Sequence, residues 1–336
     1  MPRKPRIEYE GAVYHVMCRG NGSQAIFLSD RDREMFLDTL GEACGRCGWK
    51  IHAYVLMGNH YHLLLETPEA NLVVGMKWFQ GTYTQRFNSR HKRWGHLFQG
   101  RYKALNIEGG SGEYFSTVAG YIHLNPARAF LFDLKREPLE TYCWSSYPFY
   151  LSAANRPEWL CVEKVLGNFQ GLDDSKGWKA YAEYTRSRVD EIARSDNPTE
   201  QDPEWSRLRR GWFLGSELFR KELMDRMDGV LSGKQRSSFS GIQVVQHDEV
   251  EAERLVLRGL DALGLDDGDL DGLRKNCPEK YAIAWLVRRN TCVRNQWIKE
   301  RLKMGVATNF AMFIKRMEEG EFGEAEFRRI QKNIKS

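Results

Sequence analysis

A short turn between two β-favouring runs is the feature that most constrains how this chain can fold. Residues 50–57 and residues 60–67 are rich in aliphatic and aromatic side chains, and only Gly58 and Asn59 separate them. A two-residue connection of this kind predicts a β-hairpin, because glycine and asparagine accept the positive φ angles of tight hairpin turns. The fold must therefore contain an antiparallel pair of strands at this point.

The segments around the hairpin alternate between strand and helix patterns. A β-favouring run at residues 14–18 precedes a helix that begins near Asp30. After the hairpin, helical, extended and helical patterns follow in turn over residues 71–87, 97–107 and 113–125. The order β-α-β-β-α-β predicts an α+β domain of the ferredoxin-like kind, with a sheet rich in antiparallel pairs.

A chain of 336 residues is too long for one ordinary hydrophobic core. The composition changes after residue 150, so we predict an α+β domain at residues 1–150, a mostly helical connector at 151–240 and an all-α domain at 241–336. The last part contains three closely spaced helical patterns, at residues 279–289, 294–302 and 307–319.

Charge is distributed unevenly, although the net charge is only +5. Residues 274–336 carry 15 Lys and Arg against 7 Asp and Glu, and residues 248–271 are acidic. Residues 70–107 contain no Asp or Glu, but seven basic residues: Lys77, Arg86, Arg90, Lys92, Arg93, Arg101 and Lys103. Two basic zones separated by an acidic one indicate two surfaces that face a polyanion, the alternative being solvated faces that happen to be basic.

Several classes of protein are disfavoured by what the sequence lacks. It has no apolar run of about 18 residues and no signal-peptide core, so we expect no membrane partner and a cytoplasmic location. Its seven cysteines are scattered, and Cys44 and Cys47 lack a second pair at zinc-ribbon spacing. We therefore expect a reduced, soluble protein.

Two histidines stand two positions apart at the start of the second hairpin strand. Side chains alternate between the faces of a strand, so His60 and His62 point to one face and Tyr61 points to the other. Two imidazoles on one face can share a cation. The alternative for this spacing is a pair of hydrogen-bonded core histidines, and the spacing alone does not decide between them.

Tyr121 and Asn125 lie four residues apart on a predicted helix and therefore face the same way. A phenol with a pKa of about 10 is a poor nucleophile at neutral pH, but a cation that polarises a phosphate can make it competent. Asn125 can offer an oxygen ligand beside two histidine nitrogens. The alternative is that Asn125 caps a helix beginning at Pro126 and that Tyr121 is a core aromatic residue.

Three separated motifs resemble those of the REP-associated tyrosine transposases, which belong to the single-tyrosine HUH transposase superfamily. They are Gly-Asn-His-Tyr-His-Leu-Leu-Leu-Glu at residues 58–66, Phe-Gln-Gly-Arg-Tyr-Lys at residues 98–103 and Tyr-Ile-His-Leu-Asn-Pro-Ala-Arg at residues 121–128. The opening Tyr-His-Val-Met-Cys-Arg-Gly-Asn at residues 14–21 fits the same pattern. The resemblance therefore covers roughly residues 7–150, and three motifs in the right order are far more specific than any one of them.

The resemblance implies an HUH nuclease domain in which His60 and His62 are metal ligands, Tyr121 is the nucleophile and Asn125 assists on the metal side. Mg²⁺ or Mn²⁺ is the implied cation. Tyr114 is a rival nucleophile, but it lacks an Asn or Gln four residues later.

The implied reaction is the transesterification of single-stranded DNA. Tyr121 attacks a phosphodiester, forms a 5′-phosphotyrosine and releases a 3′-hydroxyl that can later reverse the step on another strand. The implied partner is hairpin-forming repetitive DNA, similar to repetitive extragenic palindromes. The oligomeric state is left open between monomer and dimer, and association with the nucleoid is expected.

Basic and aromatic residues alternate between residues 80 and 103, a composition typical of surfaces that bind unpaired strands. We expect phosphate contacts from Arg90, Lys92, Arg93, Arg101 and Lys103. The aromatic residues available to stack on bases are Tyr83, Phe87, Trp94, Phe98 and Tyr102, of which Tyr83 and Phe87 are also good candidates for a helix core.

The three helical patterns at residues 279–319 predict a helix-turn-helix unit. They resemble the trihelical DNA-binding tail of some long members of the same transposase family, which is similar to the C-terminal domain of the replication initiator DnaA. The third helix would offer Asn309, Lys315 and Arg316 to DNA. An ordinary three-helix packing domain without DNA contacts is the alternative.

Two other functions remain open at this stage. One is a sequence-specific DNA-binding regulator whose HUH domain does not cut. The other is a zinc hydrolase that uses His60 and His62, which lacks a third His, Asp or Glu at recognisable spacing.

Overall fold

The structure is a computed structural model, and it describes residues 6–110, 112–169, 172–195, 208, 211–231, 242–291, 293–305 and 310–334. The chain forms two compact units, Arg6–Leu223 and Met224–Ser336, and each is described by itself. The predicted three-part division of the chain stays a prediction.

The first unit is built on a five-stranded sheet with the spatial order β2-β3-β1-β4-β5. The strands are β1 (Ala12–Arg19), β2 (Lys50–Leu56), β3 (His60–Thr67), β4 (Lys103–Ile107) and β5 (Phe213–Leu214). The predicted hairpin is confirmed, because β2 and β3 pair antiparallel across the turn. β5 pairs with β4 in parallel, so the sheet is mixed.

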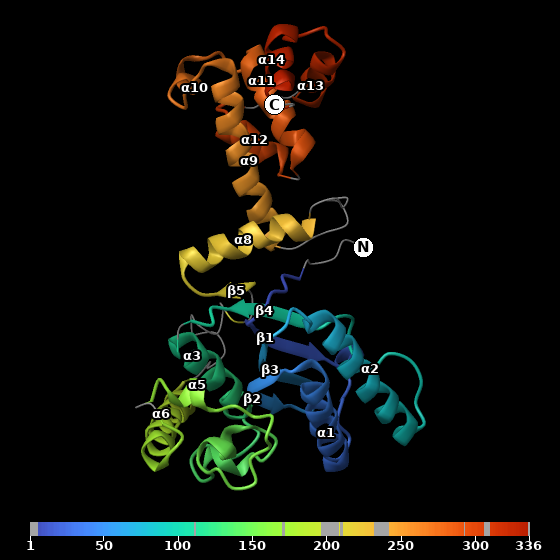
Figure 1. Cartoon of the computed structure of the whole chain (residues 1–336), viewed down its shortest axis with the longest axis vertical. Coiled ribbons are helices and arrows are strands. Elements are labelled where there is room, and N and C mark those ends of the chain that lie inside the picture. Colours follow the sequence, from blue (N-terminus) through green and yellow to red (C-terminus); the bar gives the residue numbers. More distant parts are fainter. Residues whose placement is uncertain are drawn as a thin grey trace. The chain divides into compact units, whose positions relative to one another are not determined.

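Helices cover both faces of this sheet (Figure 1). On one face, Tyr61 of β3 packs against Phe36 of α1 (Asp30–Cys47) and Phe79 of α2 (Leu72–His91), with ring centroids 4.8 and 6.2 Å apart. On the other face, His62 lies against Tyr121 of α3 (Gly112–His123). The alternation of side chains along β3 therefore separates an apolar layer from the layer that contains the histidines.

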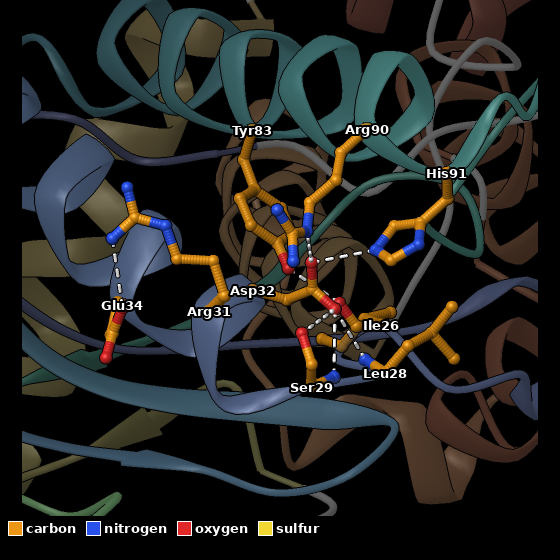
Figure 2. Close-up of polar contacts among 9 residues, drawn as sticks. All are labelled: Ile26, Leu28, Ser29, Arg31, Asp32, Glu34, Tyr83, Arg90 and His91. Carbon is orange, nitrogen blue, oxygen red and sulfur yellow. Dashed lines mark hydrogen bonds and ion pairs between the residues drawn. The ribbon is translucent and has the colours of Figure 1, made fainter.

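Asp32 fastens the start of α1 to the end of α2, as Figure 2 shows. Its carboxylate accepts hydrogen bonds from the backbone N–H groups of Leu28 and Ser29, and from His91 Nε2 at 2.8 Å. Arg90 Nε lies 3.3 Å away. Burial alone would raise the pKa of Asp32, but these hydrogen bonds outweigh it and hold the pKa below its usual value.

The segment after α3 returns to the sheet and then continues in helices. A short helix α4 (Asn125–Arg128) follows α3 directly. His123 is buried between Tyr181 Oη and Ser146 Oγ, each 2.7 Å from one of its ring nitrogens. The other elements of this unit are η1 (Asn21–Ser23), η2 (Leu139–Thr141), η3 (Tyr147–Tyr150), α5 (Glu163–Leu166) and α6 (Ser175–Arg194), and α8 (Glu217–Leu231) extends from this unit into the second.

The described part of the second unit is helical, as predicted. Its elements are α9 (Ile242–Leu263), α10 (Asp269–Gly272), α11 (Pro278–Asn290), α12 (Asn295–Arg301), α13 (Phe310–Glu318) and α14 (Glu324–Ile334). Tyr281 and Trp285 of α11 are buried with Ile298 of α12 and Ile314 of α13 in one core. Across the residues that the structure describes in both units, no helix has the length and apolar character needed to cross a bilayer.

Candidate active site

A cavity of about 490 Å³ opens on the face of the sheet that carries the histidines. Strands β1 and β3, the segment that leads into β4, and helices α3 and α4 all contribute to its wall. The polar side chains that line it are Arg19, His60, His62, Gln99, Arg101, Lys103, Tyr121, Asn125 and Arg128. The four residues of the predicted catalytic set therefore meet at one place, although they come from two distant parts of the sequence.

His60 and His62 point to the same face of β3, as their spacing predicted. Their ring centroids are 5.2 Å apart, and both rings line the cavity. His60 pairs in register with Arg19 of β1, and His62 pairs with Met17. The two imidazoles are therefore close enough to contact one bound cation.

Hydrogen bonds define the tautomer of His60. Asn59 Nδ2 donates to the Ser23 carbonyl at 3.1 Å, so the Asn59 Oδ1 atom is the acceptor for His60 Nδ1 at 2.7 Å. His60 Nδ1 must then carry the hydrogen, and Nε2 retains its lone pair. A lone pair on Nε2 is what a metal ligand requires.

His62 makes a hydrogen bond to a histidine that the sequence analysis did not single out. His62 Nδ1 lies 2.9 Å from Nε2 of His15, a fully buried residue of β1. Burial lowers the pKa of His15 to about 3, and it lowers the pKa of His62 well below its ordinary value. Burial, followed by repulsion from Arg19, lowers the pKa of His60 to about 4. All three rings are therefore neutral near pH 7, and their lone pairs are available.

Tyr121 faces the two histidines from α3. Its ring centroid lies 5.8 Å from that of His62 and 5.3 Å from that of His15, and its exposed fraction is 6%. The guanidinium carbon of Arg128 lies 5.6 Å from the centre of the Tyr121 ring. Arg128 therefore places a guanidinium over the Tyr121 ring at the edge of the cavity.

Asn125 presents its amide oxygen toward the cavity. Its Nδ2 donates to the Tyr121 carbonyl at 2.9 Å and to the Ile122 carbonyl at 3.4 Å. Because a carbonyl accepts only from the NH₂ group, Oδ1 is the atom left for the cavity. The alternative in which Asn125 caps a helix from Pro126 is wrong, since α4 begins at Asn125 with Leu124 as its N-cap residue, and the Asn125 side chain bonds back to α3.

These donors fit a divalent cation. Nε2 of His60, Nε2 of His62 and Oδ1 of Asn125 are the nitrogen and oxygen donors that could contact a cation here; a mixed set of this kind suits Mn²⁺, whereas Mg²⁺ prefers oxygen ligands. A cation here would need the amide oxygen, because within the described ranges no group of three or more His, Cys, Asp or Glu side chains comes together.

The predicted phosphate contacts divide into two groups. Arg101 and Lys103 line the cavity, together with Arg19 and Arg128, which the sequence analysis had not selected. Arg90, Lys92 and Arg93 lie instead at the end of α2, where Arg90 pairs with Asp32 and the Arg93 guanidinium lies 5.9 Å from the centre of the Phe87 ring. Their contact with DNA stays a prediction.

The structure also divides the five aromatic residues that were candidates for base stacking. Tyr83 and Phe87 are fully buried, which agrees with the helix-core alternative, and Phe98 and Tyr102 are buried as well. All four belong to the hydrophobic core of this unit. Trp94 alone of the five is exposed, with an exposed fraction of 91%.

The predicted contacts of the helix-turn-helix unit are placed only in part. Lys315 and Arg316 lie on α13 near acidic neighbours, with Lys315 Nζ 3.5 Å from Glu319 and Arg316 Nε 3.3 Å from Glu321. Asn309 lies outside the described residues. The proposed DNA contacts of this unit stay predictions.

Comparison with known proteins found similarity to transposases. Residues 8–125 match the family model described as "Transposase IS200 like". A solved structure described as "Structure of the REP associates tyrosine transposase bound to a REP hairpin" has 13% sequence identity and a TM-score of 0.39, covering 48% of this chain and 92% of that one. No curated protein matches the chain. The family match confirms the resemblance found in the sequence, and it supports a transposase-like role in DNA processing.

Proposed function

We propose that this chain, whose residues 8–125 match the IS200-like transposases, cuts and rejoins single-stranded DNA with Tyr121 as its nucleophile. The observation that carries the proposal is the meeting of Tyr121, His60, His62 and Asn125 in one cavity. Tyr121 is one of the buried residues of the hydrophobic core, but it also lines this cavity, where it faces two neutral imidazoles and the Asn125 side chain among basic side chains.

The negative charge of a DNA strand is the property that the basic side chains of the cavity can bind. Arg19, Arg101 and Lys103 line the cavity and can hold the phosphates of a strand, which is the main source of affinity for nucleic acid. His60, His62 and Asn125 would hold a divalent cation. When bound, that cation supplies Lewis-acid polarisation of the scissile phosphate.

The chemical step is a transesterification at phosphorus. The Tyr121 oxygen loses its proton and forms a bond to phosphorus, while the bond from phosphorus to the 3′ oxygen breaks. The proton lost by the phenol is balanced by the one gained at the 3′-hydroxyl, so the products are a 5′-phosphotyrosine and a free 3′ end. The ester is retained in the covalent intermediate, so a second 3′-hydroxyl can reverse the step without a further energy source.

The proposed substrate is an unpaired strand next to a hairpin formed by a repeat. Tyr121 is recessed, with only 6% of its surface exposed, so the scissile phosphate must enter the cavity to reach it. A single strand can bend into such a space, and its bases are free to contact the protein.

The deciding experiment uses the full chain, a labelled hairpin oligonucleotide from a repeat of its own genome, and Mn²⁺. We expect a covalent protein–DNA adduct on a denaturing gel, and we expect Tyr121→Phe to abolish it. Tyr114→Phe is the matched control, because Tyr114 lies on the same helix α3 but does not line the cavity. An adduct that persists in Tyr121→Phe would assign the nucleophile elsewhere.

A DNA-binding regulator is the second candidate function. It is favoured by α11, α12 and α13, whose bounds lie within a few residues of the three helices predicted for a helix-turn-helix unit. A wild-type protein that binds the repeat tightly but never forms an adduct would establish this function in place of strand cleavage.

A further inference from the structure

Trp94 holds its indole almost fully in solvent, in the loop between α2 and β4. Its exposed fraction of 91% compares with 73% for Val74, the next most exposed large apolar side chain of the described residues. Tryptophan is usually largely buried, and exposed aromatic surface marks places where a partner binds. Packing in the core of this unit therefore does not explain why a tryptophan stands at this position.

The loop around Trp94 is fixed by hydrogen bonds. Asn88 Nδ2 donates to the Gly95 carbonyl at 3.0 Å, and the Arg93 N–H donates to the Asn88 carbonyl at 2.9 Å. Lys92 and Gly95 both adopt positive φ angles, of 50° and 91°. The backbone therefore bends at Lys92 and again at Gly95, and between these bends the Trp94 indole is exposed to solvent.

The same segment leads directly into the wall of the cavity. Gln99 lines the cavity, and its N–H donates to the Arg19 carbonyl at 2.8 Å. Trp94 and Gln99 are five positions apart in the sequence, a span of at most about 17 Å. No Asp or Glu occurs between residues 70 and 107, so this segment itself contributes only basic or neutral side chains.

We propose that Trp94 stacks on an unpaired base of the DNA strand whose phosphate occupies the cavity, while Lys92 and Arg93 hold the adjoining phosphates. This inference rests on the proposed function and adds to it a contact with the bases. Stacking on an indole is tolerant of sequence, because every base has an aromatic face.

The test separates base contacts from phosphate contacts. Fluorescence anisotropy in EDTA, which prevents cleavage, would compare a labelled (dT)20 strand with a strand of 20 abasic sites that has the same phosphates. We expect wild type to bind (dT)20 at least roughly tenfold more tightly than the abasic strand. Trp94→Phe should keep most of this preference, Trp94→Leu should lose it, and Val74→Ala serves as the control on an exposed apolar residue.

Two outcomes overturn the inference: no preference for (dT)20 in wild type, or an unchanged preference in Trp94→Leu. The adduct assay distinguishes this failure from failure of the proposed function. A wild-type protein that forms the Tyr121 adduct but whose binding is unaffected by Trp94→Leu still cuts DNA, and only the stacking contact is then wrong.

A second inference comes from an independent contact, the hydrogen bond between His15 and His62. His15 Nδ1 has no hydrogen-bond partner among the described residues, so the bond from Nε2 to His62 is the polar contact that its ring makes. The two rings stack with centroids 5.1 Å apart, and the edge of His15 also meets the Tyr121 ring. The hydrogen bond to His15 can therefore determine which nitrogen of His62 carries the hydrogen.

Only one arrangement of hydrogens on this pair permits a cation at His62. If His62 Nδ1 carries the hydrogen and donates to His15, then His62 Nε2 retains a lone pair toward the cavity. If His15 donates instead, the hydrogen on His62 moves to Nε2 and blocks the cation. Asn59 already fixes the corresponding hydrogen of His60 on Nδ1.

We infer that His15 is a positioning residue, which accepts the Nδ1 hydrogen of His62 and so holds His62 in the tautomer that binds a cation. Partners of this kind, behind a ligating histidine, set both the orientation of the ring and the position of its hydrogen. This inference rests on the proposed cation site but not on cleavage.

The test measures the tautomer and the cation affinity directly. In protein labelled with ¹⁵N-histidine and saturated with Mg²⁺, we expect His62 to carry its hydrogen on Nδ1. The affinity for Mn²⁺, measured from the electron paramagnetic resonance signal of the free ion, should fall by about 10- to 100-fold in His15→Phe, which cannot accept a hydrogen bond. His15→Gln can still accept one and should stay within a few fold of wild type.

His15→Asn is the further variant in case His15→Phe does not fold, because its side chain is too short to reach His62. Equal losses of Mn²⁺ affinity in His15→Gln and His15→Asn would overturn the inference, as would an Nε2 hydrogen on His62 in the Mg²⁺-saturated protein. A wild-type protein that binds Mn²⁺ through His62 but forms no DNA adduct contradicts the proposed cleavage and leaves this inference standing.

Discussion

Glu66 is a nearly buried carboxylate near the end of β3, on the strand that begins with His60. Its Oε2 accepts hydrogen bonds from His52 Nε2 at 2.9 Å and from Lys164 Nζ at 2.6 Å. The bond from His52 is the largest influence on Glu66, and with that from Lys164 it outweighs burial and lowers the pKa of Glu66 to about 2. Because Lys164 belongs to α5, this one carboxylate ties the sheet to a helix 98 residues later in the chain.

The low pKa makes the stability of the first unit depend on pH in a defined window. The folded pKa lies below the unfolded value of about 4.3, so Glu66 contributes stability above pH 4.3, and that contribution is lost as the pH falls toward 2. We expect Glu66→Gln to lower the free energy of unfolding by on the order of 2 kcal/mol at pH 7 and to flatten its dependence on pH between about 4.5 and 2.

Urea denaturation of both proteins across this pH range checks the prediction. Glu34→Gln is the control, since Glu34 forms only an exposed pair with Arg31. If the free energy of unfolding depends on pH in the same way for wild type and Glu66→Gln, the contacts of Glu66 do not set its pKa.

Single residues of the site were predictable where local periodicity determines them. His60 and His62 share a face because a strand alternates its side chains, and Tyr121 and Asn125 share a stripe because a helix repeats about every four residues. Arg19 and His15 were missed for a different reason. They reach the histidines through the pairing of β1 with β3, and local pattern does not determine that register.

At the scale of elements, the junction of α1 with α2 depends on Asp32. A buried carboxylate that caps one helix, pairs with Arg90 and accepts a hydrogen bond from His91 of another helix is costly to neutralise, because its partners then lose an acceptor. We expect Asp32→Asn to lower the free energy of unfolding by about 2 kcal/mol. Chemical denaturation should give a loss below about 0.5 kcal/mol for Asp30→Asn, which changes an exposed residue of the same helix. A similar loss for both variants would contradict the assignment.

The elements themselves were mostly visible in the sequence, but their ends and one strand were not. The hairpin and the first helix were found at nearly their observed bounds, whereas the extended run expected from residue 97 becomes a regular strand only at Lys103. β5 is only two residues long and pairs with a strand more than 100 residues earlier. A pair so short and so distant in the sequence leaves no local pattern that predicts a strand.

At the scale of the whole molecule, cutting and holding DNA are predicted to be separable. The proposed catalytic residues lie in Arg6–Leu223, and the predicted helix-turn-helix contacts lie in Met224–Ser336. We expect the double variant Lys315→Ala, Arg316→Ala to weaken binding to duplex DNA and to reduce the slope of log K against log salt by about 1.8, the effect of two lost phosphate contacts.

Adduct formation on a saturating hairpin should stay unchanged in that variant. The control is Arg328→Ala, Arg329→Ala on α14, which removes the same charge from another helix of the same unit. Equal salt slopes for the two double variants would mean that α13 makes no specific contact and contributes only its net charge.

The burial of His123 determines how long a fragment of the chain must be to keep the proposed site intact. This residue stands between Tyr121 and Asn125, and its ring is held by Ser146 and by Tyr181 of α6. A fragment that stopped at residue 125, where the family match ends, would leave both nitrogens of that imidazole without these partners and would lack the rings of Tyr150 and Tyr181 that pack against it. The smallest piece of this protein that keeps the proposed site in its observed surroundings therefore extends at least to α6, well past the residues that match the family model.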